Sequence, residues 1–333
     1  MSTLESAPPM TLGGRDFVSA ADLTRPEVER VFARATELKA EYLAEGRHAD
    51  PPLVGRTLAM LFQHPSLRTR VTFEAGMTQL GGHGIYLAAG DVGLGLRETV
   101  SDVARNLERF VDGIMARLAA HDVVAELAAR SDVPVVNALT NREHPCQALA
   151  DLFTLRERFG SLDGVVLAFV GDGNNVFHSL AFLGAAFGME VRLAHPPGYG
   201  PNPAIVGQAE ALARIHGGRI VIAEEPAEVV RGAAVIYTDA WTSMGQEVET
   251  DVRREAFARY RVDTALLAAA GPDAVVMHCL PAHRGEEIAD EVMDGPRSII
   301  WVQSENRLHA QKGLLVELLG SDRAAGGTFG ADR

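Results

Sequence analysis

Residues 57–80 read TLAMLFQHPSLRTRVTFEAGMTQL. The first six of them form an apolar run, and from Val71 onward apolar side chains recur with the spacing of a helix. Pro65 and Ser66 stand where such a helix would begin. We therefore predict a strand, a tight turn and a helix, which is the unit that builds parallel sheets with helical connections.

The turn within this stretch is His64-Pro65-Ser66-Leu67-Arg68-Thr69-Arg70. A helix start offers unpaired N–H groups and the positive end of the helix dipole, and the turn adds two hydroxyls and two guanidinium groups. These groups favour a phosphate site. The competing interpretation is a capped helix with a solvated basic first turn. We favour phosphate, because basic residues in a first turn oppose the dipole.

Short apolar runs alternate with helical patterns along the rest of the chain. The expected strands are residues 57–62, 84–87, 112–116, 133–137, 165–170, 190–194, 219–223, 233–238, 274–278 and 297–302. This alternation predicts an α/β fold with two domains, each a parallel sheet with helices on both faces, joined by two crossing helices around 145–160 and 303–319.

The domain boundary is expected inside the first of these helices. We predict one domain over residues 1–150 and a second over 151–320, with the last helix packing back towards the first domain. Residues 321–333 are rich in glycine and charge and are expected to form a disordered tail.

Composition narrows the class of protein. With 44 acidic and 31 basic residues the net charge is −13, which argues against a general nucleic-acid or membrane binder. Two cysteines give no disulfide framework, no apolar run approaches about 18 residues, and the start lacks a signal-peptide pattern. We expect a cytoplasmic protein that binds small molecules.

Polar motifs follow several of the predicted strands, where ligands of parallel sheets gather. Arg117 closes an apolar strand and either reaches a ligand or lies at the surface. In His144-Pro145-Cys146-Gln147, Pro145 fits the first turn of a helix. His144 then either donates to a carbonyl oxygen or merely caps the helix, Gln147 lies in the first turn, and Cys146 packs in the core.

Three further motifs also follow predicted strands. Gly171-Asp172-Gly173-Asn174-Asn175 resembles a dinucleotide turn, but Val176 replaces its third glycine, so we favour a turn that presents the asparagines. Asp239 can hold an amine and Ser243 a carboxylate, or the loop is only an Asx turn. Cys279, between His278 and Leu280-Pro281, is either core or an ionisable thiol beside a substrate.

Together these residues resemble the ornithine carbamoyltransferases, within the aspartate/ornithine carbamoyltransferase family. The resemblance runs from Asp16 to Leu319. Its motifs are Ser66 to Arg70, the His-Pro-Cys-Gln stretch, Gly171 to Asn175, Asp239 with Ser243-Met244-Gly245, His278-Cys279-Leu280-Pro281 and Glu305-Asn306-Arg307. The Ser-Met-Gly and His-Cys-Leu-Pro motifs resemble the ornithine branch.

The resemblance implies transfer of the carbamoyl group from carbamoyl phosphate to the δ-amine of L-ornithine, giving L-citrulline and phosphate. It implies that carbamoyl phosphate is bound by Ser66, Leu67, Arg68, Thr69, Arg117, His144, Gln147, Cys279, Leu280 and Arg307. It implies that ornithine is bound by Asn175, Asp239, Ser243 and Met244. The catalytic residues would be Cys279, Arg117, His144 and Asp239.

The resemblance also implies a homotrimer, in which a loop near Val92 to Glu98 of a neighbouring subunit completes the phosphate site. No metal or cofactor is expected. His64, Leu67 and Leu96 depart from residues common in the family and could alter affinity for the anion. A different amine acceptor, such as an acylated ornithine, putrescine or lysine, is the competing interpretation. A catalytically silent relative is disfavoured, because Arg68, Arg117, His144 and Cys279 are all present.

Overall fold

The computed structural model describes residues 12–242 and 247–320. These residues fold into two compact units. Of the described residues, unit 1 holds 12–18, 22–138 and 308–320, and unit 2 holds 19–21 and 139–307. The division thus falls before the helix in which the sequence places it, and that helix belongs wholly to unit 2. The predicted tail 321–333 lies outside the described residues.

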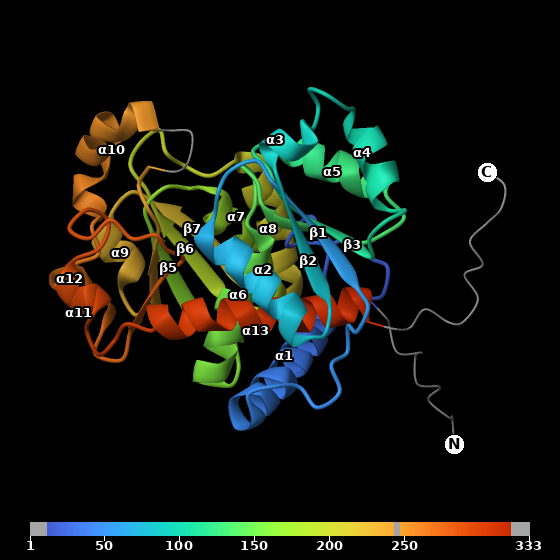
Figure 1. Ribbon diagram of the computed structural model, residues 1–333. Coiled ribbons are helices and arrows are strands. Elements are labelled where there is room, and N and C mark those ends of the chain that lie inside the picture. Colours follow the sequence, from blue (N-terminus) through green and yellow to red (C-terminus); the bar gives the residue numbers. More distant parts are fainter. Residues whose placement is uncertain (1–11, 243–246, 321–333) are drawn as a thin grey trace, which may run out of the picture. The chain divides into compact units, whose positions relative to one another are not determined.

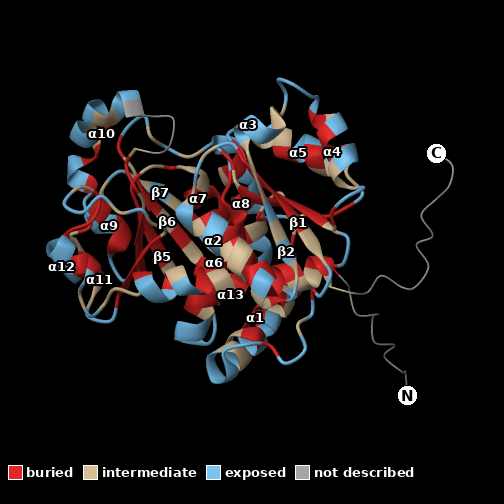
Figure 2. Ribbon diagram, in the orientation of Figure 1, coloured by how far each residue is buried: buried red, intermediate tan, exposed pale blue. Residues whose placement is uncertain are grey.

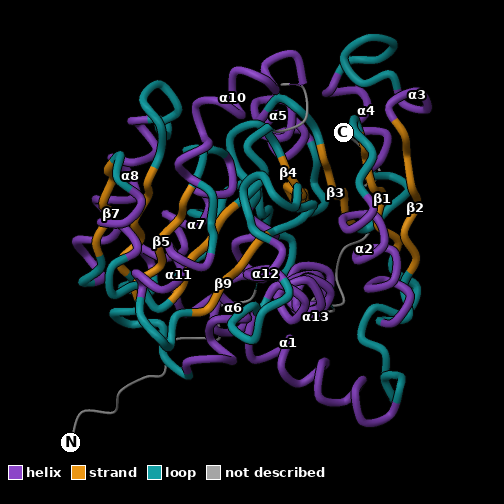
Figure 3. Tube along the Cα trace, turned by 90° about the vertical axis from the view of Figure 1, so that its left-hand side faces the viewer, coloured by secondary structure: helices purple, strands orange, loops and turns teal. Residues whose placement is uncertain are grey.

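Unit 1 contains a four-stranded sheet. Its strands are β1 (Thr57–Phe62), β2 (His83–Ala88), β3 (Gly113–Arg117) and β4 (Val135–Leu139). They lie in the order β2-β1-β3-β4, and β1 pairs in parallel with both β2 and β3 (Figure 3). The two central strands are apolar and almost wholly buried, as strands covered on both faces are.

Helices connect these strands. Those of unit 1 are α1 (Arg25–Glu45), α2 (Leu67–Gln79), α3 (Ala89–Val92), α4 (Val100–Leu107) and α5 (His121–Arg130). The side chains of Ala59, Ile114 and Val135 from the sheet meet Ala104, Val124 and Leu127 from α4 and α5 in one buried cluster. The strand and helix predicted for residues 57–80 are therefore confirmed as β1 and α2.

Unit 2 contains a five-stranded sheet. Its strands are β5 (Val166–Val170), β6 (Glu190–Ala194), β7 (Arg219–Ala223), β8 (Val235–Thr238) and β9 (Val275–His278). The order is β7-β6-β5-β8-β9, and all four pairings are parallel. Figure 1 shows β5, β6 and β7 side by side. β8 and β9 are buried at every residue and β5 at all but its first, whereas β7 is an edge strand with exposed residues (Figure 2).

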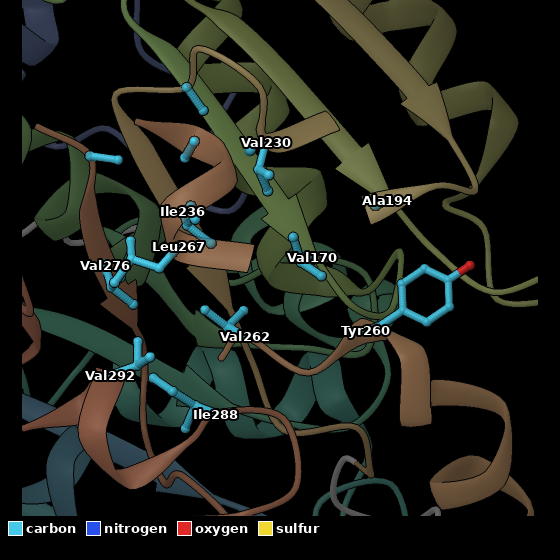
Figure 4. Close-up of a cluster of buried hydrophobic side chains, with 14 of the residues drawn as sticks. Val170, Ala194, Val230, Ile236, Tyr260, Val262, Leu267, Val276, Ile288 and Val292 are labelled. Carbon is cyan, nitrogen blue, oxygen red and sulfur yellow. The ribbon is translucent and has the colours of Figure 1, made fainter. Parts of the chain in front are cut away.

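The helices of unit 2 cover this sheet. They are α6 (Pro145–Phe159), α7 (Asn175–Ala186), α8 (Pro203–His216), α9 (Pro226–Val230), α10 (Thr250–Phe257), α11 (Thr264–Ala270), α12 (Asp290–Met293) and the first part of α13 (Ile300–Leu319), with 3-10 turns η1 (Glu247–Glu249) and η2 (Ala258–Tyr260). Figure 4 shows the core under one face, where Val170, Ile236 and Val276 from three strands meet Val230, Val262 and Ile288.

Both sheets have a point at which the strand order reverses. In unit 1 it lies between β1 and β3, and in unit 2 between β5 and β8. Connections leave the two strands in opposite directions there, so a crevice forms beyond their carboxyl ends. In unit 1, the Ser66 turn follows β1, and Arg117 is the last residue of β3. In unit 2, the Gly171 turn follows β5, and Asp239 follows β8. The fold therefore places both sets of predicted residues at these reversals.

One predicted strand is wrong. Residues 297–302 were expected to be extended because Ile299, Ile300, Trp301 and Val302 favour strands. Instead Ser298 forms a single bridge with Val276, and α13 begins at Ile300. Helical packing of Ile300, which is fully buried, outweighs the local strand preference.

Unit 1 buries a lysine. The Lys312 side chain on α13 is fully buried; its Nζ donates to Gln79 Oε1 at 3.0 Å and lies 4.7 Å from the centroid of the Tyr42 ring. Burial lowers the pKa of this amine from 10.5 to about 8, and the charge of Glu41 opposes the change. Between these two pH values the unfolded chain holds a proton that the folded chain has lost.

We therefore expect Lys312→Met to stabilise the protein. Since the folded pKa lies below the unfolded one, the cost of charging Lys312 is full below pH 8 and disappears as pH rises towards 10.5. Urea unfolding at pH 7 should show a gain of about 1–2 kcal/mol, shrinking at pH 9.5. The chain's other lysine, half-buried Lys39, is the control, and Lys39→Met should change stability by less than about 0.5 kcal/mol. An equal gain from both would contradict the assignment.

Within the described ranges, no helix combines the length and apolar character needed to cross a membrane.

Candidate active site

The N-terminus of α2 in unit 1 gathers hydrogen-bond donors. Ser66 is the N-cap, and its Oγ accepts from the Thr69 N–H at 3.4 Å. Arg117, the last residue of β3, reaches the same turn, where its Nη1 donates to Thr69 Oγ1 at 3.2 Å. Thr69 and Arg117 are both buried. A guanidinium and hydroxyls thus lie at the positive end of one helix, which suits an anion.

The two arginines of this turn differ in what they contact. Arg70 donates from Nε to Glu74 Oε1 at 3.0 Å, and its guanidinium carbon lies 3.9 Å from the centroid of the Tyr86 ring. The expectation of two guanidinium groups in one cradle is therefore wrong for Arg70. Arg68 is half-buried in the first turn, while the Leu67 side chain is 75% exposed, so that Leu67 can serve a ligand through its backbone N–H.

A thiol and a carboxylate meet at the carboxyl ends of the strands of unit 2. Cys279 follows β9 and Asp239 follows β8, and Cys279 Sγ lies 3.0 Å from Asp239 Oδ1. Asp239 Oδ2 accepts from Asn174 Nδ2 at 2.8 Å, and its Oδ1 accepts from the Ala240 N–H at 2.8 Å. These bonds fix the carboxylate beside the thiol, where the pair can hold a cationic amine and take part in its deprotonation.

Asn174, rather than Asn175, contacts this carboxylate. Asn174 is the N-cap of α7, and its Oδ1 accepts from the N–H groups of Val176 and Phe177. Asn175 Nδ2 instead donates to the Thr140 carbonyl at 2.6 Å. The two asparagines of the glycine turn therefore have different partners.

A buried His–Glu pair supports the turn after β9. The Leu280 N–H donates to His278 Nδ1 at 2.8 Å, so the ring proton lies on Nε2, which is 3.0 Å from Glu287 Oε1. Both side chains are fully buried. Leu280 has a φ of 59°, and the Leu280–Pro281 bond is cis. Sequence reasoning missed Glu287, because no local spacing links it to the motif.

The start of α6 holds the third group of side chains. His144 is the N-cap and Gln147 lies in the first turn, as predicted, and both are buried. The His144 N–H donates to Ser179 Oγ at 2.9 Å. Gln147 Oε1 accepts from Arg307 Nη1 at 2.6 Å. The last helix was expected around 303–319, but α13 begins at Ile300, so Arg307 lies in its interior rather than in its first turn.

The two cysteines have opposite environments. Cys146 is fully buried, and burial raises the pKa of its thiol from 9.0 to about 12, which confirms it as a core residue. Cys279 is partly exposed and contacts a carboxylate. Only the second cysteine is thus placed to meet a substrate.

Two residues predicted to bind ornithine, Ser243 and Met244, lie outside the described residues. Two groups of described residues have ligand atoms within 4.8 Å of one another, as a metal ion would need; they are Asp239 with His278 and Cys279, and His283 with Glu286 and Glu287. In the first group both ring nitrogens of His278 already have hydrogen-bond partners. An ion there would have to break one of these bonds, so we assign none.

These features define a class of enzyme. The chain has two parallel-sheet units, one with a helix start whose donors suit an anion and the other with a carboxylate–thiol pair, each at a reversal of strand order. Residues 15–157 match the family model described as "Aspartate/ornithine carbamoyltransferase, carbamoyl-P binding domain". Residues 163–318 match the family model described as "Aspartate/ornithine carbamoyltransferase, Asp/Orn binding domain". The chain belongs to the aspartate/ornithine carbamoyltransferase family.

Individual relatives are similar over nearly their whole length. The ornithine carbamoyltransferase of Symbiobacterium thermophilum is 51% identical over 309 residues, which is 93% of this chain and 99% of the relative. The solved ornithine carbamoyltransferase of Pyrococcus furiosus is 46% identical with a TM-score of 0.90, over 93% of this chain and 98% of that one. The solved ornithine carbamoyltransferase of Thermus thermophilus is 44% identical with a TM-score of 0.82, over 91% of this chain and 98% of that one.

Proposed function

We propose that this chain transfers the carbamoyl group of carbamoyl phosphate to the δ-amine of L-ornithine, giving L-citrulline and phosphate. The observation that carries the assignment is the contact of Cys279 Sγ with Asp239 Oδ1 at 3.0 Å. A carboxylate beside a thiol is complementary to a cationic amine rather than to a second carboxylate. The family and the names of the relatives support the same reaction.

Carbamoyl phosphate is bound by two sets of residues in this proposal. Its phosphate is held in unit 1 by Ser66, the Leu67 N–H, Arg68 and Thr69. Its carbamoyl group is held by Arg117, His144, Gln147, Cys279, Leu280 and Arg307. The support in unit 1 is the Arg117–Thr69 contact, which brings a buried guanidinium to the N-terminus of α2. In unit 2 it is the contact between Gln147 and Arg307.

Ornithine is bound by Asn175, Asp239, Ser243 and Met244 in this proposal. Its δ-amine must lose a proton before it attacks, since alkyl amines titrate near roughly 10. Asp239 and Cys279 orient the amine, and a Cys279 thiolate accepts the proton. Asn174 belongs to the same set as a positioning residue, because it donates to Asp239.

The attack of the amine nitrogen on the carbamoyl carbon forms a C–N bond and builds negative charge on the carbamoyl oxygen. Arg117 and His144 donate to that oxygen, each contributing roughly 3 kcal/mol by analogy with oxyanion holes. The attacking nitrogen still carries a second surplus proton, which passes to the phosphate as the C–O bond breaks, and the protonated phosphate leaves into the Ser66–Thr69 turn. No step requires a change of oxidation state.

Assembly and location are parts of the same proposal. We propose a homotrimer, in which the loop of residues 92–98 serves the phosphate site of a neighbouring subunit. Leu96 in that loop is 94% exposed, which supports a contact with a neighbouring subunit. A cytoplasmic location and a role in arginine metabolism belong to the same proposal. Light scattering of the purified protein tests the assembly.

The function is tested by citrulline formation from carbamoyl phosphate and ornithine, with putrescine, lysine, aspartate and N-acetylornithine as parallel acceptors. We expect ornithine to exceed each of the others in kcat/KM by several orders of magnitude. If putrescine or lysine has the highest kcat/KM, the proposed carbamoyl phosphate site stands and the proposed ornithine site is wrong. Absence of product from every acceptor would overturn the proposal itself.

A further inference from the structure

Beneath Gln147, unit 2 contains a fully buried polar cluster. Its hub is Asp151, which lies one helical turn after Gln147 on α6 and is fully buried. Asp151 Oδ1 accepts from Gln147 Nε2 at 2.7 Å and from Gln303 Nε2 at 2.7 Å, and Oδ2 accepts from Tyr237 OH at 2.9 Å. Gln303 connects this cluster to the turn after β9, because its Oε1 accepts from the His278 N–H at 2.9 Å.

The partners of Gln147 fix the orientation of its amide. Arg307 can only donate, so the atom that faces it at 2.6 Å is the amide oxygen. An ionised Asp151 can only accept, so the atom that faces it is the amide nitrogen. Burial raises the pKa of Asp151 to about 6, while hydrogen bonds from Gln147, Gln303 and Tyr237 oppose the rise, so the group is a carboxylate at neutral pH. A flipped amide would oppose donor to donor and acceptor to acceptor.

We infer that Asp151 is a specificity-determining positioning residue, which holds the Gln147 amide oxygen towards the ligand so that the site selects a carbamoyl group over an acetyl group. This inference rests on the proposed function, which assigns Gln147 to the carbamoyl group. The two ligands differ in one substituent: carbamoyl carries an NH2 group, which donates, and acetyl carries a methyl group, which does not. The amide oxygen has two lone pairs, of which Arg307 uses one.

Discrimination then follows from desolvation. A carbamoyl ligand gives the amide oxygen a second donor when it displaces water. An acetyl ligand buries the same oxygen without one, and a site built for a hydrogen bond rejects the analogue that lacks it. If the amide could turn over, its nitrogen would face the ligand instead, and this preference would be lost. Asp151 makes that rotation unfavourable although it need not touch the ligand.

The test uses two stable phosphonates that differ only in this substituent, phosphonoacetamide and acetonylphosphonate. Calorimetry of the intact protein at pH 7.5 gives a Kd for each, independent of turnover. We expect the unaltered protein to prefer phosphonoacetamide by about tenfold or more. Asp151→Asn, which can present a donor to Gln147, should bring the ratio of the two Kd values close to one. Asp151→Ser carries the same expectation and is the second variant if the first does not fold.

A double-mutant cycle separates positioning from general support. Gln147→Leu should abolish the preference, and adding Asp151→Asn to it should change the ratio no further. Tyr237→Phe removes a different partner of Asp151 and should leave the ratio intact. An unchanged ratio in folded Asp151→Asn, with both ligands weakened equally, would overturn the inference. If the unaltered protein binds phosphonoacetamide but shows no preference, the inference also fails; if it neither binds phosphonoacetamide nor forms citrulline, the proposed function fails.

Discussion

Arg117→Met is expected to lower kcat about 10³-fold with a much smaller change in the KM for carbamoyl phosphate. The guanidinium ends β3 and reaches the N-terminus of α2, where it donates to Thr69 Oγ1 at 3.2 Å. Because it is buried, its charge interacts with the developing oxyanion through little water. Steady-state kinetics with ornithine saturating measures both constants.

Arg56→Met is the matched control for this change. Arg56 precedes β1 at the opposite end of the same sheet and forms an ion pair with Asp112 at 2.7 Å. Its loss should cost some stability and leave kcat within about twofold, since it lies away from the carboxyl ends of the strands. If Arg117→Met raised KM alone and left kcat unchanged, Arg117 would bind substrate and transition state equally, and the oxyanion role would be excluded.

Cys279→Ala is expected to lower kcat about 10²- to 10⁴-fold, the range for loss of an acid–base group, and to weaken carbamoyl phosphate binding far less. The thiol is assigned to the amine through its contact with Asp239 at 3.0 Å. Arg68→Ala should show the converse pattern, with weaker carbamoyl phosphate binding as its first effect. Equal effects of the two changes on the affinity for carbamoyl phosphate would contradict this division of labour.

The second cysteine supplies the control. Cys146→Ala should retain kcat, because Cys146 is buried in α6 and its pKa is raised to about 12. Iodoacetamide at pH 8 should label Cys279 at least about tenfold faster than Cys146, since only the thiolate reacts and only Cys279 is accessible. Peptide mass analysis reads this ratio, and faster labelling of Cys146 would contradict the assignment.

The sequence predicted what local pattern determines. Apolar runs with helical spacing between them gave nine strands of two parallel sheets, and Ser66, His144 and Arg117 lie where the patterns placed them. A cap residue or a strand end follows from its immediate neighbours. The position of a motif at the carboxyl end of a strand then followed from parallel topology.

Residues whose role depends on tertiary partners could not be found this way. The sequence analysis singled out neither Asp151 nor Glu287, because only the fold brings Tyr237 and His278 to them. Arg70 was misplaced for the same reason, because Tyr86 on the neighbouring strand β2 attracts its guanidinium. Long-range contacts of this kind leave no spacing in the sequence.

Unit 1 is discontinuous along the chain, and this affects how it can be made. Residues 308–319 of α13 supply Leu314, Leu315 and Leu318 to its core, and Leu318 accepts a hydrogen bond from the Gly14 N–H. At roughly 5–20 residues per second, synthesis of residues 139–307 takes on the order of ten to thirty seconds. Throughout that interval a ribosome-bound unit 1 exposes the apolar surface that α13 will cover. The core of unit 1 is thus completed only once α13 has been made, and until then its exposed apolar surface is open to chaperones.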